Sequence, residues 1–273
     1  MSNFQIIYLN NYELSKQDIE NISKAIKLFF QNKTEYVIIK NNNMIKDINE
    51  LIPFYELLNN NIGTIQNVDT NKYTDSDNNY WVNVKYDFHT DNKNPWRSNS
   101  HLKLHTDNTI STVNNYAQLT ELVCLEPCKY SGLTTIINNN YIVELIKYVD
   151  KNTNDSLFSQ IYEREIYYSS DNKIHFKNKI LNYDNEKNNY IFSFNHTQAI
   201  KSDKNTDLDK AIVNKLNDFL EEKIMNSNLM DEIKLNMGDA LMFNDELVMH
   251  GRRSVISNRH YKKCSIFIES KIQ

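Results

Sequence analysis

The most informative segment of the chain reads Met237-Gly-Asp-Ala-Leu-Met-Phe-Asn-Asp-Glu-Leu-Val-Met-His-Gly-Arg-Arg-Ser254. Its Gly-Asp pair predicts a tight turn, and the apolar residues 240–243 that follow predict a buried strand. A second apolar run leads directly into His250, which Gly251 follows. A histidine in such a run is usually a hydrogen-bonded core residue. The adjacent glycine favours a metal ligand instead, because an ion needs a close approach of the backbone.

A second histidine and a carboxylate lie far upstream, in the motif His105-Thr-Asp107. Leu102 and Leu104 alternate with polar residues before it, which predicts a strand. Side chains two apart on a strand point the same way, so His105 and Asp107 can reach one ion. With His250 they form a ligand set for ferrous iron that leaves positions open for a co-substrate and O2. A surface turn with a capping aspartate is the alternative interpretation.

The tetrapeptide His-Thr-Asp-Asn occurs twice, starting at His89 and at His105. At most one copy can belong to an iron site. The first copy runs into a polar loop, whereas the second follows an apolar pair and precedes the predicted buried strand 119–125. We therefore assign His105 and Asp107 to the metal and expect His89 and Asp91 to be solvated loop residues.

Arg259 and Thr134 are candidates for binding a co-substrate. A 2-oxo acid chelates an open iron face through its keto oxygen and C1 carboxylate. Its distal carboxylate then needs a guanidinium, which binds carboxylates in a bidentate fork. A hydroxyl would complete that clamp, and Thr134 is the candidate, with Thr135 as the alternative one position on. Taken alone, Arg259 would more simply be a solvated surface charge.

Most of the chain after residue 80 has the pattern of short strands. The expected strands are 80–88, 102–104, 119–125, 134–137, 162–168, 174–176, 190–194, 240–243, 247–249 and 264–268, with 36–40 upstream. Many short strands with few helices indicate a mainly β fold with flanking helices, built on a double-stranded β-helix, the jelly-roll or cupin-like core.

Helices are expected in three places. One follows the N-cap Ser15, one covers about 47–58 and stops near Gly63, and one covers 208–220. Pro53 predicts a break or a late start in the second, and the Asn-rich stretches 41–43, 59–61 and 138–140 predict turns. We expect a single domain over 1–273, with a helical N-terminal part at about 1–65 and a jelly-roll core at about 80–273.

Composition excludes several classes of partner. The net charge of -4 gives no basic footprint, so nucleic acid is not expected. No apolar run approaches the roughly 20 residues that cross a bilayer, and the N-terminus lacks the layout of a signal peptide. Three irregularly spaced cysteines do not make a disulfide framework, so a reduced cytoplasmic setting is expected.

Together the motifs resemble the Fe(II)/2-oxoglutarate-dependent dioxygenases of the taurine dioxygenase and clavaminate synthase-like superfamily. The resemblance spans most of the chain and is specific at His105-x-Asp107, at Gly132-x-Thr134 and over 238–259. The tail, from His250 through Asn258-Arg-His, looks like that of the γ-butyrobetaine hydroxylase branch. The family's usual Gly-Gly-Asp-Thr is here Ser-Gly-Leu-Thr134, which keeps the hydroxyl.

This resemblance implies an oxidoreductase that binds one metal and two co-substrates. The implied catalytic and metal-binding residues are His105, Asp107 and His250, with Thr134 and Arg259 binding 2-oxoglutarate and O2 as the second co-substrate. The reaction implied is hydroxylation of an unactivated C–H bond, with succinate and CO2 as co-products. Halogenating relatives replace the metal-binding carboxylate with a small residue, so Asp107 argues for oxygen transfer.

The substrate is expected to be a small molecule, an amino acid or a related carboxylate. Basic residues near His250 suit an anionic group, and Arg253 and Lys263 are the candidate substrate contacts. Lys263 also matches a position that in some relatives reaches the substrate. The alternative is that these side chains form salt bridges with neighbouring acidic residues or face solvent.

Three other functions fit parts of the pattern. The same cofactors could serve desaturation, cyclisation or another oxidative rearrangement, which begins with the same hydrogen abstraction. A non-catalytic jelly-roll binding module is a second alternative, although such a relative would be expected to have lost some of the ligands. A zinc hydrolase is a third, but no convincing general base lies beside the ligands.

Overall fold

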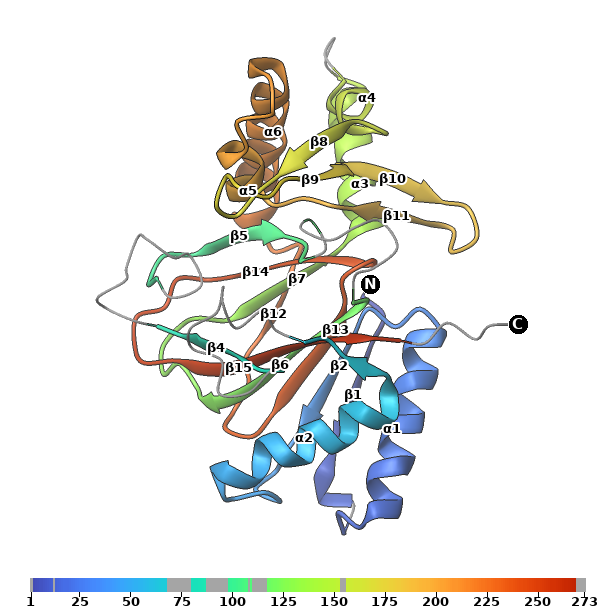
Figure 1. The fold of residues 1–273 in the computed structure, drawn as a ribbon, viewed down its shortest axis with the longest axis vertical. Helices are drawn as coiled ribbons and strands as arrows, with labels where there is room; N and C mark the ends of the chain where they lie inside the picture. The colour runs from blue at the N-terminus through green and yellow to red at the C-terminus, as the bar shows by residue number, and fades with distance from the viewer. Residues whose placement is uncertain are drawn as a thin grey trace.

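Two β-sheets packed face to face form the centre of the molecule, which is described here from a computed structural model (Figure 1). The structure describes residues 2–11, 13–67, 80–86, 98–107, 109, 117–152 and 156–268. The expected mainly β fold with flanking helices is confirmed.

The larger sheet has the strand order β1-β2-β13-β6-β15-β3, and β4 also pairs with β15. Its strands are β1 (Phe4–Tyr8), β2 (Tyr36–Lys40), β3 (Thr64–Ile65), β4 (Val82–Lys85), β6 (Leu119–Glu126), β13 (Ala240–Asn244) and β15 (His260–Phe267). The smaller sheet has the order β12-β7-β14-β5. Its strands are β5 (Leu102–His105), β7 (Thr134–Asn138), β12 (Asp231–Ile233) and β14 (Val248–Arg252).

Alternation of side chains along the strands separates the inner face of each sheet from the outer face. Ile38 and Phe243 of the larger sheet share one buried cluster with Ile136 and Val248 of the smaller sheet. Met249, the next residue after Val248, belongs instead to a cluster on the outer side. Because side chains two apart share a face, the residue after Met249 points back between the sheets.

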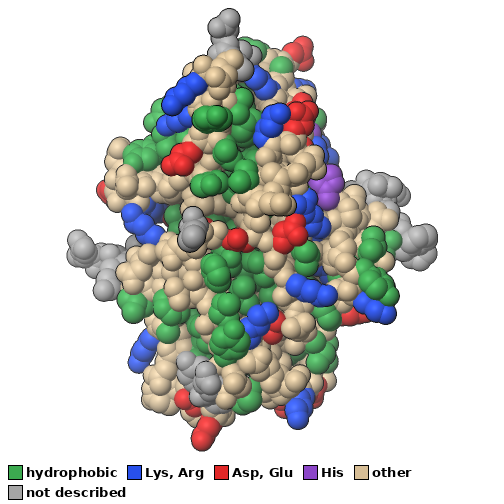
Figure 2. All heavy atoms as spheres, turned by 180° about the vertical axis from the view of Figure 1, so that it is seen from behind, with side chains coloured by type: hydrophobic (Ala, Val, Ile, Leu, Met, Phe, Trp, Pro, Cys, Tyr) green, Lys and Arg blue, Asp and Glu red, His purple; other side chains and the backbone are tan. Residues whose placement is uncertain are grey.

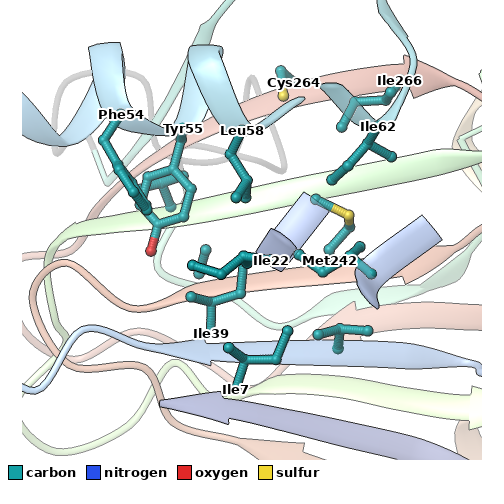
Figure 3. Packing of buried hydrophobic residues seen from close by; sticks show 14 of the residues in the cluster. Ile7, Ile22, Ile39, Phe54, Tyr55, Leu58, Ile62, Met242, Cys264 and Ile266 are labelled. Carbon is teal, nitrogen blue, oxygen red and sulfur yellow. The ribbon is translucent and has the colours of Figure 1, made fainter. Parts of the chain in front are cut away.

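Two N-terminal helices cover the outer face of the larger sheet. They are α1 (Lys16–Gln31), which follows the short 3-10 turn Leu9–Asn11, and α2 (Ile48–Ile62). Ser15 caps α1 in a capping box, as expected. Figure 3 shows side chains of α2 packed against residues of β13 and β15, among them Met242, Cys264 and Ile266. This packing forms a second core behind the sheet, where apolar burial stabilises the N-terminal part.

The prediction of a break or late start at Pro53 is wrong, because α2 runs through it without interruption. A proline in the second turn of a helix removes only one main-chain hydrogen bond, and the buried face of α2 compensates for it. Gly63 ends the helix, as expected. The Asn-rich stretch 59–61 is therefore helical and not a turn.

A segment after β7 folds beyond the smaller sheet, at the end of the molecule opposite α1 and α2 (Figure 1). It contains α3 (Asn139–Asp150), α4 (Leu157–Ile161), β8 (Glu165–Tyr168), β9 (Phe176–Lys179), β10 (Leu181–Asp184), β11 (Asn189–Phe192), α5 (His196–Lys201) and α6 (Asp207–Phe219), which continues as the π-helix Leu220–Met225. Its apolar side chains form one cluster with the outer face of the smaller sheet.

One prediction in this segment is wrong, and two predicted strands have other boundaries. Asn138 is the N-cap of α3, so the stretch 138–140 begins a helix and does not form a turn. The expected strand 162–168 is a strand only from Glu165. The expected strand 174–176 begins only at Phe176 and runs further. Within the described ranges, no helix combines the length and the apolar character needed to cross a membrane.

Candidate metal centre

His105 and His250 lie opposite each other in the pairing of β5 with β14. Both side chains point between the sheets, and their ring centroids are 4.2 Å apart. Asp107 follows β5 by two residues, with Oδ1 3.9 Å from His105 Nε2 and Oδ2 3.7 Å from His250 Nε2. One ligand atom from each of the three residues lies within 4.8 Å of the others. The structure therefore brings the three residues into a group that could bind a metal ion.

The segment that carries two of these residues is fixed by hydrogen bonds from several elements. The backbone N–H of Thr106 donates to the carbonyl of Phe194 (2.9 Å), and the N–H of Phe194 donates to Thr106 Oγ1 (3.0 Å). The N–H of Asp107 donates to both carboxylate oxygens of Asp245, at 3.0 and 2.9 Å. These contacts determine where the chain turns after β5 and therefore where Asp107 lies.

The electrostatics of the group favour two neutral imidazoles and one ionised carboxylate. Burial lowers the pKa of His105, and it lowers the pKa of His250 to well below its usual value. Burial would raise the pKa of Asp107, but the charge of Lys263, and of His250 and His105 whenever they are protonated, holds that pKa well below its usual range. This is the protonation state in which such side chains bind a metal.

Lys263 on β15 reaches the group from the larger sheet. Its Nζ lies 2.6 Å from Asp107 Oδ2, and Thr120 Oγ1 on the neighbouring β6 donates to the same oxygen at 3.1 Å. One of the two predicted substrate residues is thus placed beside the ligands. The other, Arg253, pairs with Glu232 at 2.6 Å and donates to the carbonyl of Met225.

Thr134 and Arg259 are both buried, and each has a polar atom without a partner. Thr134 Oγ1 and Arg259 Nε make no hydrogen bond within the part of the chain that the structure describes. Gly132, two residues before Thr134, lies against the arginine, since a Cβ there would come within 3.4 Å of Arg259 Cδ. The guanidinium of Arg259 also lies over the ring of Tyr261, 3.7 Å from its centroid.

The register of β7 distinguishes Thr134 from Thr135. Thr134 pairs with Arg252 and Thr135 with Gly251, so Thr134 shares the inner face with His250 and Thr135 points outward. Thr135 Oγ1 would lie 3.0 Å from a Cβ placed on Gly251. Of the two hydroxyls that the sequence left open, only that of Thr134 is on the face of the candidate centre.

Two site residues were missed by sequence reasoning, and one pair cannot be assessed. Asp245 accepts the backbone N–H of Asp107, and Thr120 donates to the carboxylate of Asp107. No local sequence motif marks either residue. An acidic residue in the turn that leads to His250 was the available signal for Asp245. The second tetrapeptide, with His89 and Asp91, lies outside the described residues.

A family profile described as "Taurine catabolism dioxygenase TauD, TfdA family" matches residues 7–265. The chain belongs to this family. TauD-family enzymes are Fe(II)/2-oxoglutarate-dependent dioxygenases, and the protein is therefore a dioxygenase. A search of curated proteins found no significant match.

Solved structures share the fold of this TauD-family enzyme at low sequence identity. The oxygenase OrfP, solved with Fe and alpha-ketoglutaric acid, has a TM-score of 0.62 at 12% identity, over 93% of this chain and 80% of OrfP. Asparagine oxygenase, solved with Fe(II), 2S,3S-3-hydroxyasparagine and succinate, has a TM-score of 0.61 at 9% identity, over 93% and 79%. A taurine dioxygenase from Burkholderia xenovorans has a TM-score of 0.59 at 11% identity, over 93% and 83%.

Proposed function

We propose that the enzyme hydroxylates an unactivated C–H bond of a small molecule, an amino acid or a related carboxylate. His105, Asp107 and His250 would bind Fe(II), and Thr134 and Arg259 would bind the distal carboxylate of 2-oxoglutarate. The observation that carries the proposal is the convergence of three ligand atoms within 4.8 Å on the inner face of the smaller sheet. Bound iron and 2-oxoglutarate would supply the activation of O2, with succinate and CO2 as co-products.

Buried positive charge supports the 2-oxoglutarate site. Burial, and then the charge of Arg259, lowers the pKa of Arg252 to about 10. Arg252 Nη2 is bound to the carbonyls of Ser98 and Ser100, both at 2.8 Å. Arg259 Nε makes no hydrogen bond within the described residues, and neither does Thr134 Oγ1. A buried guanidinium is costly unless an anion pairs with it, so a carboxylate is the ligand that this place favours.

The donor set supports Fe(II). Two neutral imidazole nitrogens and one carboxylate oxygen are a ligand set that would hold a ferrous ion and leave positions open for a co-substrate and O2. The residues would bind the ion, orient the co-substrate and exclude water, since His105 and His250 are only 5% and 6% exposed.

The proposed substrate class rests on Lys263 and on the relatives. The ammonium of Lys263 lies beside Asp107 and is therefore within reach of an anionic group placed over the metal. Asparagine oxygenase and OrfP have been solved with hydroxylated amino acids, 3-hydroxyasparagine in the first and (3S)-hydroxy-L-Arg in a variant of the second. The resemblance of the tail to the γ-butyrobetaine hydroxylase branch also favours a small carboxylate. Arg253 has less support, because Glu232 already pairs with it.

The surface charge on one face of the molecule gives no support to a nucleic-acid partner (Figure 2). On the face drawn in Figure 2, Lys and Arg side chains are interspersed with Asp and Glu side chains and form no continuous basic stripe. Nucleic-acid binding needs such a stripe. The three cysteines are free and buried, which supports a reducing, cytoplasmic setting.

Anaerobic titration with Fe(II) and 2-oxoglutarate tests the proposal. A weak visible charge-transfer band should appear in the wild-type protein and disappear in His105→Ala and His250→Ala. His89→Ala is the matched control and should leave the band unchanged. Loss of the band in His89→Ala with retention in His105→Ala would show that the other tetrapeptide binds the metal. Succinate release over a panel of amino acids, followed by product analysis, then separates hydroxylation from desaturation or cyclisation.

A further inference from the structure

The two candidate imidazole ligands differ in what their second nitrogen contacts. His105 Nδ1 lies 2.8 Å from the carbonyl oxygen of Lys103. A carbonyl oxygen can only accept, so Nδ1 of His105 carries the hydrogen and Nε2 keeps its lone pair for a metal. The main chain thus fixes the tautomer of His105.

No main-chain carbonyl does this for His250. Its Nδ1 is buried and makes no hydrogen bond within the described residues. Asp245 Oδ1 lies 3.7 Å from it, which is an ion-pair distance and slightly too long for a hydrogen bond. A small rotation of the imidazole would bring the two atoms into contact.

Asp245 is placed to act on both ligands from one position. It lies in the turn between β13 and β14, is fully buried, and its own N–H donates to the carbonyl of Gln118 at 2.9 Å. Both of its carboxylate oxygens accept the N–H of Asp107, at 3.0 and 2.9 Å. The same carboxylate therefore contacts the backbone of one ligand and faces the imidazole of another.

We infer that Asp245 is a positioning residue of the metal centre. It places Asp107 through the backbone N–H, and it accepts the Nδ1–H of His250 so that Nε2 is directed at the metal. Its negative charge also raises the basicity of His250 as a ligand. The inference rests on the proposed function, because it assumes that these three side chains bind the metal.

Substitutions at Asp245 separate this role from a purely structural one. Asp245→Asn keeps the size and one acceptor oxygen but removes the charge, whereas Asp245→Ala removes both. Asn244→Ala is the matched control, because Asn244 Oδ1 accepts the N–H of Glu246 at 3.0 Å in the same turn. The substitution removes this hydrogen bond from the turn. Asn244 itself makes no hydrogen bond to Asp107 or His250 within the described residues.

Two measurements test the inference. Imidazole ¹⁵N shifts of the metal-free protein, assigned through His250→Gln, should show the Nδ1–H tautomer of His250 in the wild type and a tautomer mixture in Asp245→Ala. Calorimetric titration with Co(II) should show an affinity loss of roughly 10–100-fold in Asp245→Ala, with Asp245→Asn in between. Asn244→Ala should match the wild type in both.

The inference is overturned if Asp245→Ala leaves both the tautomer and the Co(II) affinity unchanged, or if Asn244→Ala reduces the affinity as much. Should Asp245→Ala fail to fold, Asp245→Asn decides by the same readouts. A wild-type protein that binds neither Co(II) nor Fe(II) would instead contradict the proposed function. The tautomer in the metal-free protein would still show whether Asp245 orients His250.

Discussion

Lys263 and Asp107 form an ion pair across the space between the two sheets, with Nζ 2.6 Å from Oδ2. The lysine comes from the larger sheet and the aspartate from the end of a strand in the smaller one. A cationic side chain therefore lies in direct contact with a proposed metal ligand. Either the lysine pairs with Asp107 alone, or it also binds the anionic group of a substrate.

Lys263→Met separates these two roles. If Lys263 binds substrate, the KM of the best amino-acid substrate should rise about 10–100-fold, the effect of losing one charge-assisted hydrogen bond. The Fe(II)/2-oxoglutarate band should persist. Lys262→Met is the control. Lys262 precedes Lys263 on β15 and lies opposite Val123 of β6, whose side chain packs in the core beneath the N-terminal helices, so Lys262 is on the other face of the sheet from Lys263. Loss of the band in Lys263→Met would mean that the lysine acts through Asp107 instead.

Thr134→Val should weaken 2-oxoglutarate binding about 10-fold, because one hydrogen bond to a charged carboxylate is lost while the volume is kept. Thr135→Val should not, since Thr135 shares a face with Gly251 and not with His250. Titration of the charge-transfer band against 2-oxoglutarate measures both. Equal losses in the two variants would contradict the assignment of Thr134.

Arg259→Gln should weaken 2-oxoglutarate binding by about 10–100-fold, since a neutral amide cannot replace a bidentate, charged donor. Arg259→Lys should recover only part of the loss. The control is Arg253→Gln, which breaks the ion pair with Glu232. The same titration reports all three, and a normal dissociation constant in Arg259→Gln would exclude Arg259 from the co-substrate site.

The three candidate metal ligands could be predicted from the sequence because each one lies in a local pattern. His105 and Asp107 lie two apart after an alternating strand, and His250 follows an apolar run. Which strands pair is a nonlocal property, however, so neither the opposition of His105 to His250 nor the inward face of Thr134 could be derived. The contact of Asp245 with Asp107 was also out of reach, because it joins residues 138 positions apart.

Helix boundaries were harder to predict for a related reason. Asn138 has the side chain of a turn residue, yet its oxygen accepts the N–H groups of Asn140 and Tyr141 and so starts α3. Asparagine serves turns and N-caps through the same hydrogen bonds. Burial of Ile142, Val143 and Ile146 decides between the two, and burial depends on the outer core of the smaller sheet.

Gly251→Ala should weaken metal binding, although residue 251 is not a ligand. A Cβ at this position would come within 2.7 Å of the main-chain oxygen of Leu102 on β5. The methyl group would force β5 away from β14 and would therefore move His105 away from His250. Overpacking of this kind costs about 1–3 kcal/mol of folding free energy. Thermal unfolding of the metal-free protein and Co(II) titration should both show a loss, and unchanged Co(II) affinity would mean that the strands tolerate the shift.

Glu121→Gln should change how stability depends on pH. Glu121 lies fully buried on the outer face of β6, where Asn59 Nδ2 of α2 donates to its Oε2 at 2.5 Å. Burial raises the pKa of Glu121 from 4.5 to about 8, against the opposing effect of the bonds from Asn59 and Cys264. Between these two values the folded chain binds more protons than the unfolded chain. The contribution of Glu121 to the free energy of unfolding is therefore fully present below pH 4.5 and is lost as pH rises through about 8.

The free energy of unfolding of the wild type should accordingly fall relative to Glu121→Gln, by up to about 1.4 kcal/mol per pH unit within that window. The glutamine keeps an acceptor for Asn59 and cannot ionise, so the variant should be the more stable protein at pH 8. Urea unfolding of both proteins at several pH values gives the difference directly, because all other titrating groups are shared. A difference that stays constant from acid to mildly alkaline pH would show that Glu121 does not remain protonated beneath α2.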